Sequence, residues 1–177
     1  MSAQAAFRTK ILFDTNQLLQ RAKSEEEILS QTASQLMKLL NRSLIVYPEQ
    51  NGDLGSEQFF GVDGETAQNI FSAPEERDAA NWTFANKKRS GAGTDSYPDA
   101  KGLYLALRTG GGVFGVIGID LSEKPLDAFE NSVLLSILGE GALAIENRRN
   151  ALEKEQATVQ AKNEELRANL LRTISHD

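Results

Sequence analysis

The last third of the chain carries an apolar residue at every seventh position, and this repeat constrains the fold more than any other feature. Its members are Leu138, Ile145, Leu152, Val159 and Leu166. Because an α-helix has about 3.6 residues per turn, such a repeat forms a stripe along one helical face, and sustained heptads are typical of a coiled coil. The pattern predicts a long C-terminal helix whose stripe packs against a partner.

The alternate core positions of this repeat are mixed in character. They are occupied by Ala142, Arg149, Gln156, Asn163 and Leu170. Polar residues at such positions lower the stability of a coil while they select its register. Before about residue 150 two interpretations stay open: the helix packs on its own domain, or its apolar stripe forms part of a dimer seam, which is the contact between two such helices. Beyond that point no other part of the chain remains to cover the stripe, so we expect a homodimer formed with a second copy.

Two amphipathic helices are predicted at the start of the chain. Apolar residues recur at intervals of three or four from Phe7 to Ala22, which marks one face of a helix. Ser24 followed by Glu27 is a capping-box pattern, in which each side chain satisfies a free backbone N–H at a helix start. This pattern predicts that a second helix begins there.

The middle of the chain contains apolar runs typical of β-strands. Residues 43–47 (SLIVY) predict a strand that ends at Pro48, and residues 58–62 (QFFGV) predict a second short one. Residues 102–108 and 113–120 flank TGGG, which indicates a hairpin with a glycine turn. The hairpin strands are apolar on both faces near their centres, so we expect layers that cover the sheet on both sides.

A further helix is predicted over residues 74–89, because Ser72 with Glu75 forms another capping-box pattern. Helices then precede, interrupt and follow the strands. The predicted fold class is α+β, with a central antiparallel sheet flanked by helices and followed by a long C-terminal coiled-coil helix. We expect one domain over residues 1–150 and a signalling helix over residues 151–177.

Composition excludes several classes of function. The chain has no cysteine and one histidine, so disulfides, thiolate chemistry and a dedicated metal site are not expected. A net charge of −6 argues against nucleic-acid binding, which needs a basic surface. The longest apolar run, at residues 113–119, is too short to span a bilayer. These features predict a cytoplasmic domain.

Two stretches resemble a known family. NWTFANKKRSGAGTDSYPDAKGLYLAL at residues 81–107, followed by GVFGVIGID, is similar to the GAF domain of Kdp-type potassium-responsive sensor histidine kinases. LLRTISHD at residues 170–177 resembles the start of the H-box of such kinases. The resemblance extends over roughly residues 10–177 and implies that the chain stops just inside the next domain of a longer kinase.

The H-box resemblance implies a role for the end of the chain. His176 is expected to be the phosphoacceptor of the full-length kinase, and Asp177 the acid that orients its ring. A neutral imidazole is a competent nucleophile near neutral pH. ATP and Mg would be bound by a kinase domain that this chain lacks, so we expect the chain alone to be inactive and to hold no cofactor. The full-length protein is expected in the inner membrane, with a response regulator as its partner.

GAF domains commonly hold a small ligand between the sheet and the helix on its distal face. Here that helix carries Trp82 and Phe84, and the loop after it carries Arg89, Thr94 and Asp95, which are the candidate ligand-binding residues. An apolar wall with a few polar groups suits a small molecule. The alternative is that Trp82 belongs to a plain hydrophobic core.

The predicted function is therefore a sensory or relay domain of a sensor kinase that controls potassium-uptake genes, with the signal passing through a dimeric helix to the phosphoacceptor histidine. Two alternatives stay open. In the first, the chain is a structural dimerisation spacer that has lost ligand binding. In the second, it is a GAF regulator that binds a small molecule and belongs to another signalling protein. Catalysis by the chain itself is the least favoured function, because no constellation of residues supports it.

Overall fold

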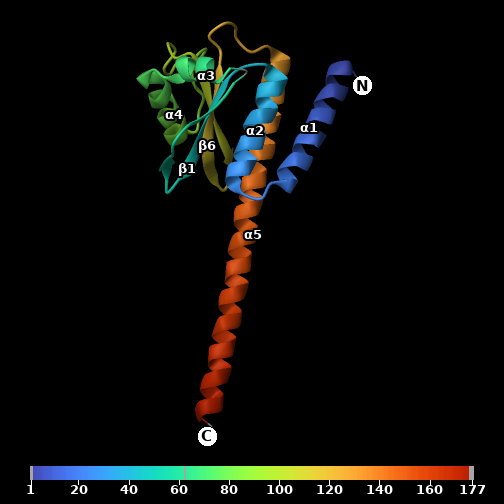
Figure 1. Cartoon of the computed structure of the whole chain (residues 1–177), viewed down its shortest axis with the longest axis vertical. Coiled ribbons are helices and arrows are strands. Elements are labelled where there is room, and N and C mark those ends of the chain that lie inside the picture. The colour runs from blue at the N-terminus through green and yellow to red at the C-terminus, as the bar shows by residue number, and fades with distance from the viewer. Residues whose placement is uncertain (1, 62, 176–177) are drawn as a thin grey trace. The chain divides into compact units, whose positions relative to one another are not determined.

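The computed structural model describes residues 2–61 and 63–175 (Figure 1). The chain forms two compact units, Met1–Ile145 and Glu146–Asp177. The described helices are α1 (Ala3–Arg21), α2 (Glu25–Leu40), α3 (Gly64–Phe71), α4 (Pro74–Asn86) and α5 (Ala128–Ser175). The described strands are β1 (Leu44–Gln50), β2 (Asp53–Leu54), β3 (Gln58–Phe60), β4 (Ser90–Gly91), β5 (Gly102–Thr109) and β6 (Gly112–Asp120).

The strands form one antiparallel sheet in the order β2–β1–β6–β5–β4, and β3 pairs with β1 beside β2. Strand β6 is central, since Ile117 pairs with Val46 of β1 on one side and with Leu105 of β5 on the other. The predicted α+β class and the predicted β5–β6 hairpin are confirmed. Strand β1 continues through Pro48 to Gln50, so the prediction that it ends at the proline was wrong.

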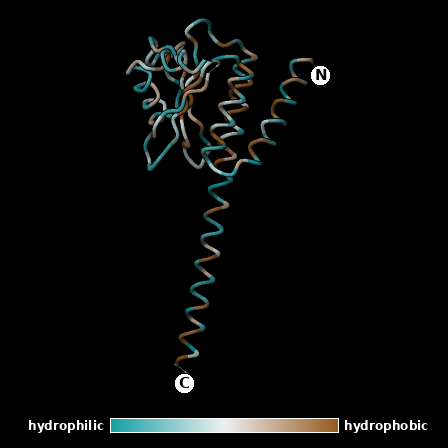
Figure 2. The backbone as a smooth tube through the Cα atoms, in the orientation of Figure 1, coloured by the Kyte–Doolittle hydropathy of each residue, from teal (hydrophilic) through white to brown (hydrophobic). Residues whose placement is uncertain are grey.

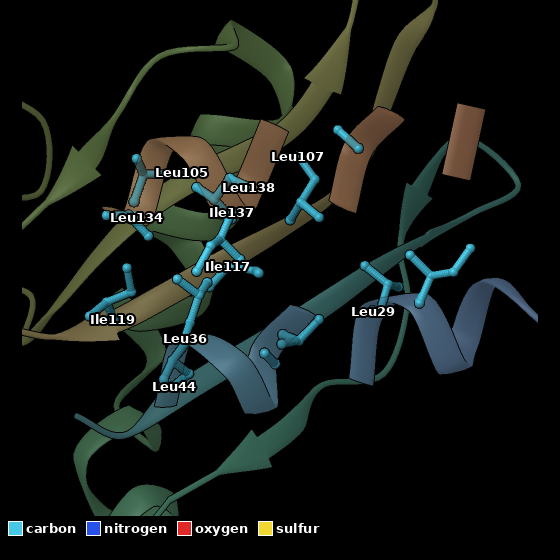
Figure 3. Packing of buried hydrophobic residues seen from close by; sticks show 14 of the residues in the cluster. Leu29, Leu36, Leu44, Leu105, Leu107, Ile117, Ile119, Leu134, Ile137 and Leu138 are labelled. Carbon is cyan, nitrogen blue, oxygen red and sulfur yellow. The ribbon is translucent and has the colours of Figure 1, made fainter. Parts of the chain in front are cut away.

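Helices α2 and α5 cover one face of the sheet. Leu36 of α2 and Leu134 and Ile137 of α5 pack against Leu105 and Ile117 of the strands (Figure 3). Leu36, Leu134, Ile137 and Ile117 are completely inaccessible to solvent. Replacing a fully buried leucine with alanine costs about 2–5 kcal/mol, so the packing of this layer contributes substantially to the domain's stability.

Helix α1 packs outside this layer. It buries Ile11 and Leu19, and the Asn16 Nδ2 donates a hydrogen bond to Glu140 Oε2 of α5 at 3.0 Å. Phe13, in contrast, is 63% exposed. The first half of α5 is therefore held by α1 as well as by the sheet.

The structure confirms both predicted helix starts, at residues 25 and 74, but confirms the predicted side-chain cap only for the first. Ser24 Oγ accepts a hydrogen bond from the backbone N–H of Glu27 at 3.1 Å and begins α2. Ser72 instead lies at the end of α3, a helix that sequence patterns did not predict, and its hydroxyl donates to Asn69 O. Helix α4 begins after Ala73 without a side-chain cap, so the capping box of Ser72 with Glu75 was wrong. The helix also ends at Asn86, three residues before the predicted end.

Arg42 joins the sheet to the start of α5. The residue is only 7% exposed, and its guanidinium donates hydrogen bonds to three carbonyl oxygens at 2.7–3.0 Å, those of Asp120, Lys124 and Pro125. It also forms an ion pair with Glu130 at 3.3 Å. A buried charge needs such partners, because burial without them costs several kcal/mol. Arg42 therefore fixes the loop that leads from β6 into α5.

Within the described residues, α5 is the one helix long and apolar enough to cross a membrane by length and composition. A core helix of a soluble protein also meets these criteria of length and composition, and α5 has such a core segment. Its apolar residues from Val133 to Ile145 lie in the hydrophobic core of the first unit, which accounts for the composition of this segment.

Candidate functional site

The sheet face beneath α3 and α4 is the place where the sequence predicts a small ligand. Tyr47, Tyr104 and Val116 project from this face and are buried, together with Phe71 of α3 and Ala79 of α4. They form a second hydrophobic cluster on the side of the sheet opposite α2 and α5. Two of its five strand residues are tyrosines, so polar atoms are buried here along with the aromatic rings.

The ring of Tyr104 fills the space above the centre of this face. Tyr104 is fully buried. A Cβ atom built on Gly118 of β6 would lie 2.4 Å from Tyr104 Cε1, and one built on Gly102 would lie 2.9 Å from the Tyr104 hydroxyl. The two glycines therefore make room for the tyrosine ring, which occupies this part of the face with protein atoms.

A buried carboxylate anchors this ring. Glu76 of α4 is 1% exposed. Its Oε1 accepts hydrogen bonds from the Tyr104 hydroxyl at 2.8 Å and from the Gly102 N–H at 3.0 Å, and its Oε2 accepts one from the Lys101 N–H at 3.0 Å. These bonds join α4 to the beginning of β5. Hydrogen bonds to a charged acceptor are roughly twice as strong as neutral ones, so Glu76 acts here as a structural residue.

The two buried tyrosines have raised pKa values. Burial, and then the adjacent Glu76 carboxylate, raise the pKa of Tyr104 far above its ordinary value. Burial and the charge of Glu57 raise the pKa of Tyr47 to about 12, although the Arg77 guanidinium, 5.1 Å from the ring centroid, opposes this. Both phenols therefore stay protonated near neutral pH, and Tyr104 remains a hydrogen-bond donor.

A second polar connection holds α4 to the edge strand β4. The hydroxyls of Thr83 and Ser90 are 2.7 Å apart, and Ser90 Oγ donates to Ala79 O at 2.7 Å. Both side chains are fully buried. Within the described residues, no buried side-chain nitrogen or oxygen atom lacks a hydrogen-bond partner. The described polar groups beneath α4 are thus satisfied by the protein itself.

The predicted aromatic ligand residues differ in their surroundings. Phe84 is half-buried and packs against the cluster that contains Tyr104. Trp82 is also half-buried but does not belong to that cluster. The ligand-binding role predicted for both rings stays a prediction.

The predicted loop residues lie partly in another place. Arg89 and Thr94 line a groove of about 440 Å³ beside Asn131 of α5, whereas Trp82, Phe84 and Asp95 do not line it. Arg89 donates a hydrogen bond to Asn131 Oδ1 at 3.0 Å, and the Thr94 hydroxyl is hydrogen-bonded within its own loop. The five predicted ligand-binding residues therefore do not line this groove together.

The predicted dimer seam divides into a buried and an exposed part. Leu138 and Ile145 are 5% and 0% exposed in the core of the first unit. Leu152, Val159 and Leu166 are 43–62% exposed in the second unit. Leu138 and Ile145 therefore pack inside their own domain, which corrects the prediction that they belong to the seam. The physical reason is that a core-facing stripe and a coiled-coil stripe have nearly the same spacing.

The second unit is a helical segment with alternating polar and apolar residues along its length (Figure 2). All residues from 150 to 175 are exposed. His176 and Asp177 lie outside the described residues, so their predicted roles stay predictions. In the part of the chain that the structure describes, no group of three or more His, Cys, Asp or Glu residues could hold a metal ion.

Comparison with known proteins identifies relatives of this chain among sensor proteins. No model of a known protein family matches the chain. The chain is 33% identical over 171 residues to the sensor protein KdpD of Clostridium acetobutylicum and 26% identical over 173 residues to KdpD of Escherichia coli, and each alignment covers 96% of the chain. Over nearly its whole length, the chain is therefore similar to one segment of the Kdp sensor proteins.

A solved structure shows that the chain has the GAF fold. It is the GAF domain of the potassium sensor histidine kinase KdpD from Escherichia coli, which superposes with a TM-score of 0.56 and 19% sequence identity. The match covers 85% of this chain and 99% of that domain. The alignments of this chain cover only 19% and 18% of the length of the two curated relatives.

Sequence reasoning missed Glu76, although the residue organises the distal face of this GAF domain. Glu75 and Glu76 both lie in the first turn of α4, where acidic residues favour the helix dipole. Glu75 is exposed and Glu76 is buried. The local pattern gives both residues the same explanation, so no signal in a single sequence distinguishes the buried one.

Proposed function

We propose that the chain is the sensory or relay domain of a potassium-responsive sensor histidine kinase and that it passes its signal through a dimeric α5. The names of both curated relatives and of the solved GAF domain support this function. The observation that carries the mechanism is the continuity of α5. One helix contributes Leu134 and Ile137 to the domain core and then presents Leu152 and Val159 to solvent.

This continuity supplies a physical route for a signal. Because Leu134 and Ile137 are packed without exposed surface, a rearrangement of the core has to move or rotate the helix. Such helix shifts are a common form of switching transition. The polar seam residues Arg149, Gln156 and Asn163 suit a coil with two packings of similar energy. Replacing all three with leucine is expected to hold the full-length kinase in one output state.

Relay is favoured over sensing of a small molecule on the distal face. Tyr104 occupies the middle of that face, and Glu76 already accepts three hydrogen bonds from the protein. This arrangement also fits the second candidate function, a dimerising spacer without a ligand. The two differ in one respect: changes in the domain core alter kinase output in a relay but leave it unchanged in a spacer.

The remaining parts of the mechanism belong to the full-length protein. We propose that His176 accepts the phosphoryl group from ATP bound in a separate kinase domain, with Asp177 orienting the ring, and that a response regulator receives the group. We also propose that this domain lies in the cytoplasm and that the full-length protein is attached to the inner membrane. The chain itself would supply dimerisation and signal transfer.

Cysteine cross-linking tests the dimeric seam. The chain has no cysteine, so one introduced thiol reports on its own position. Val159→Cys places a thiol on the apolar stripe, and Ala161→Cys places one on the nearly opposite helical face, since successive residues are about 100° apart. Disulfides form when the two Cα atoms are about 4.4–6.8 Å apart. We expect rapid cross-linking of Val159→Cys and little of Ala161→Cys.

Both positions are exposed, so neither substitution should disturb folding. Equal cross-linking of the two variants, or of neither at concentrations where the unmodified chain sediments as a dimer, would contradict the proposed seam. In the full-length kinase, the mild core variant Ile137→Val then tests relay separately from dimerisation, because it should alter kinase output in a relay and leave it unchanged in a spacer.

A further inference from the structure

A basic groove lies between three elements of the first unit, away from the distal face. It has a volume of about 250 Å³ and is bounded by the connection from α4 to β4, strand β5 and helix α5. Four cationic residues line it: Lys87, Lys88, Arg89 and Arg108. We call this feature the basic groove.

These cations are concentrated in a chain of net charge −6. Among the described residues, no ion pair is seen at Lys87, Lys88 or Arg108, whereas Arg42 pairs with Glu130 and Arg77 with Glu57. Arg89 has a neutral partner, the amide oxygen of Asn131 at 3.0 Å. The groove cations are therefore not held in direct ion pairs with acidic side chains of the described residues.

A purely structural role explains only part of this cluster. Lys87 lies at the C-terminal cap of α4, where the partial negative charge of the helix end favours a cation. Arg108 comes from β5, a separate element that owes nothing to that helix end. Two distant segments thus deliver cations to one concave surface, which a helix-capping role does not require.

The floor of the groove is apolar. Leu105 of β5 and Leu138 of α5 are 4% and 5% exposed, and Leu135 of α5 is 48% exposed. An exposed leucine beside cationic side chains offers contact to a ligand that has an apolar part and an anionic part. Small-molecule sites commonly combine an apolar lining with a few polar groups that fix orientation.

We propose that the basic groove binds the phosphate group of a small organic phosphate, with the apolar part of the ligand resting on Leu135. Arginine and lysine are the residues that bind phosphate most often, and a dianion suits four cations better than a singly charged carboxylate does. The small volume restricts the ligand to a compact molecule or to the headgroup end of a larger one. The proposal does not depend on the proposed function in signalling.

Phenyl phosphate is a suitable probe because it carries both parts of the ligand. Its binding to the isotopically labelled chain can be followed by shifts of backbone amide signals, with inorganic phosphate and benzoate as comparison ligands. We expect shifts at residues 87–89, 105–108 and 135–139. We also expect phenyl phosphate to bind at least several-fold more tightly than inorganic phosphate, which lacks the apolar part, or benzoate, which lacks the second charge.

A pair of double variants separates the groove from the general charge of the chain. Lys88→Gln with Arg108→Gln removes two exposed groove cations, and Lys10→Gln with Arg21→Gln removes two exposed cations of α1. We expect the groove variant to weaken phenyl phosphate binding by about tenfold or more, which corresponds to about 1.4 kcal/mol. The α1 variant should bind like the unmodified chain.

Vesicles identify the source of the phosphate. Binding to vesicles of phosphatidylglycerol and not to those of phosphatidylcholine, lost only in the groove variant, would place the phosphate on a lipid. Binding of phenyl phosphate alone would place it on a soluble molecule. Equal loss in both double variants, shifts scattered over the surface, or no binding of either probe would overturn the proposal.

Discussion

Glu76→Gln provides a direct test of the polar anchor beneath α4. Glutamine has nearly the shape of glutamate but only one acceptor oxygen. In the native protein the two carboxylate oxygens accept hydrogen bonds from Lys101 N–H, Gly102 N–H and the Tyr104 hydroxyl. In either orientation of the glutamine amide, its NH₂ group faces a backbone N–H of Lys101 or Gly102, and that donor loses its acceptor.

The expected cost follows from this geometry. A hydrogen bond to a charged group contributes about 1.5–3 kcal/mol, and a buried donor left without a partner costs about 1–3 kcal/mol. The amide should turn so that the Lys101 N–H, which is only part-buried, loses its acceptor, because water can reach it. We therefore expect Glu76→Gln to lower the free energy of unfolding by about 2 kcal/mol, toward the lower end of these ranges.

Urea denaturation followed by circular dichroism measures this difference, with Glu75→Gln as the matched control. Glu75 is the exposed neighbour in the same helical turn, and exposed substitutions usually change stability by less than about 0.5 kcal/mol. If Glu76→Gln were no more destabilising than Glu75→Gln, the hydrogen bonds at this carboxylate would not anchor α4.

Three further predictions test the surroundings of this anchor and the loop before α5. The free energy of unfolding should fall as pH rises from 10.0 toward about 12. In this range Tyr47 loses its phenol proton in the unfolded chain but keeps it in the folded protein, where its pKa is raised to about 12, so rising pH favours the unfolded chain. Tyr47→Phe should weaken this pH dependence in denaturation measurements, and Tyr97→Phe, at a 39% exposed position, should not. Gly118→Ala should destabilise by about 1–3 kcal/mol, since its Cβ would meet Tyr104 and Ile45 at 2.4 and 2.7 Å, whereas Gly110→Ala meets no atom within 4 Å and should be nearly neutral in thermal melts. Arg42→Met should cost about 3–5 kcal/mol, because Glu130 and three carbonyl oxygens lose their buried partner; a cost equal to that of the exposed Arg21→Met would refute this role.

Local patterns were sufficient where a short segment determines its own structure. The periodicity from Phe7 to Ala22 predicted α1, and the Ser24 cap predicted the start of α2, because capping uses atoms within one helical turn. The glycine turn between two apolar runs predicted the β5–β6 hairpin. The same logic failed at Ser72, whose capping pattern was overridden when the chain used that residue to end α3.

Long-range contacts decided which residues of a uniform local pattern are buried and which are exposed. The apolar heptad is uniform from Leu138 to Leu166, yet the sheet and α1 cover its first part and leave its second part exposed. Glu75 and Glu76 are adjacent acids in one helical turn, yet only Glu76 meets the donors at the start of β5. Periodicity and capping depend on neighbours in the sequence, so the sequence by itself determined the helices, the hairpin and the apolar stripe of α5. Burial depends on segments far away in the chain, so only the tertiary structure decided which leucines form the core, which carboxylate is structural and where the cations of β5 and the α4–β4 connection meet.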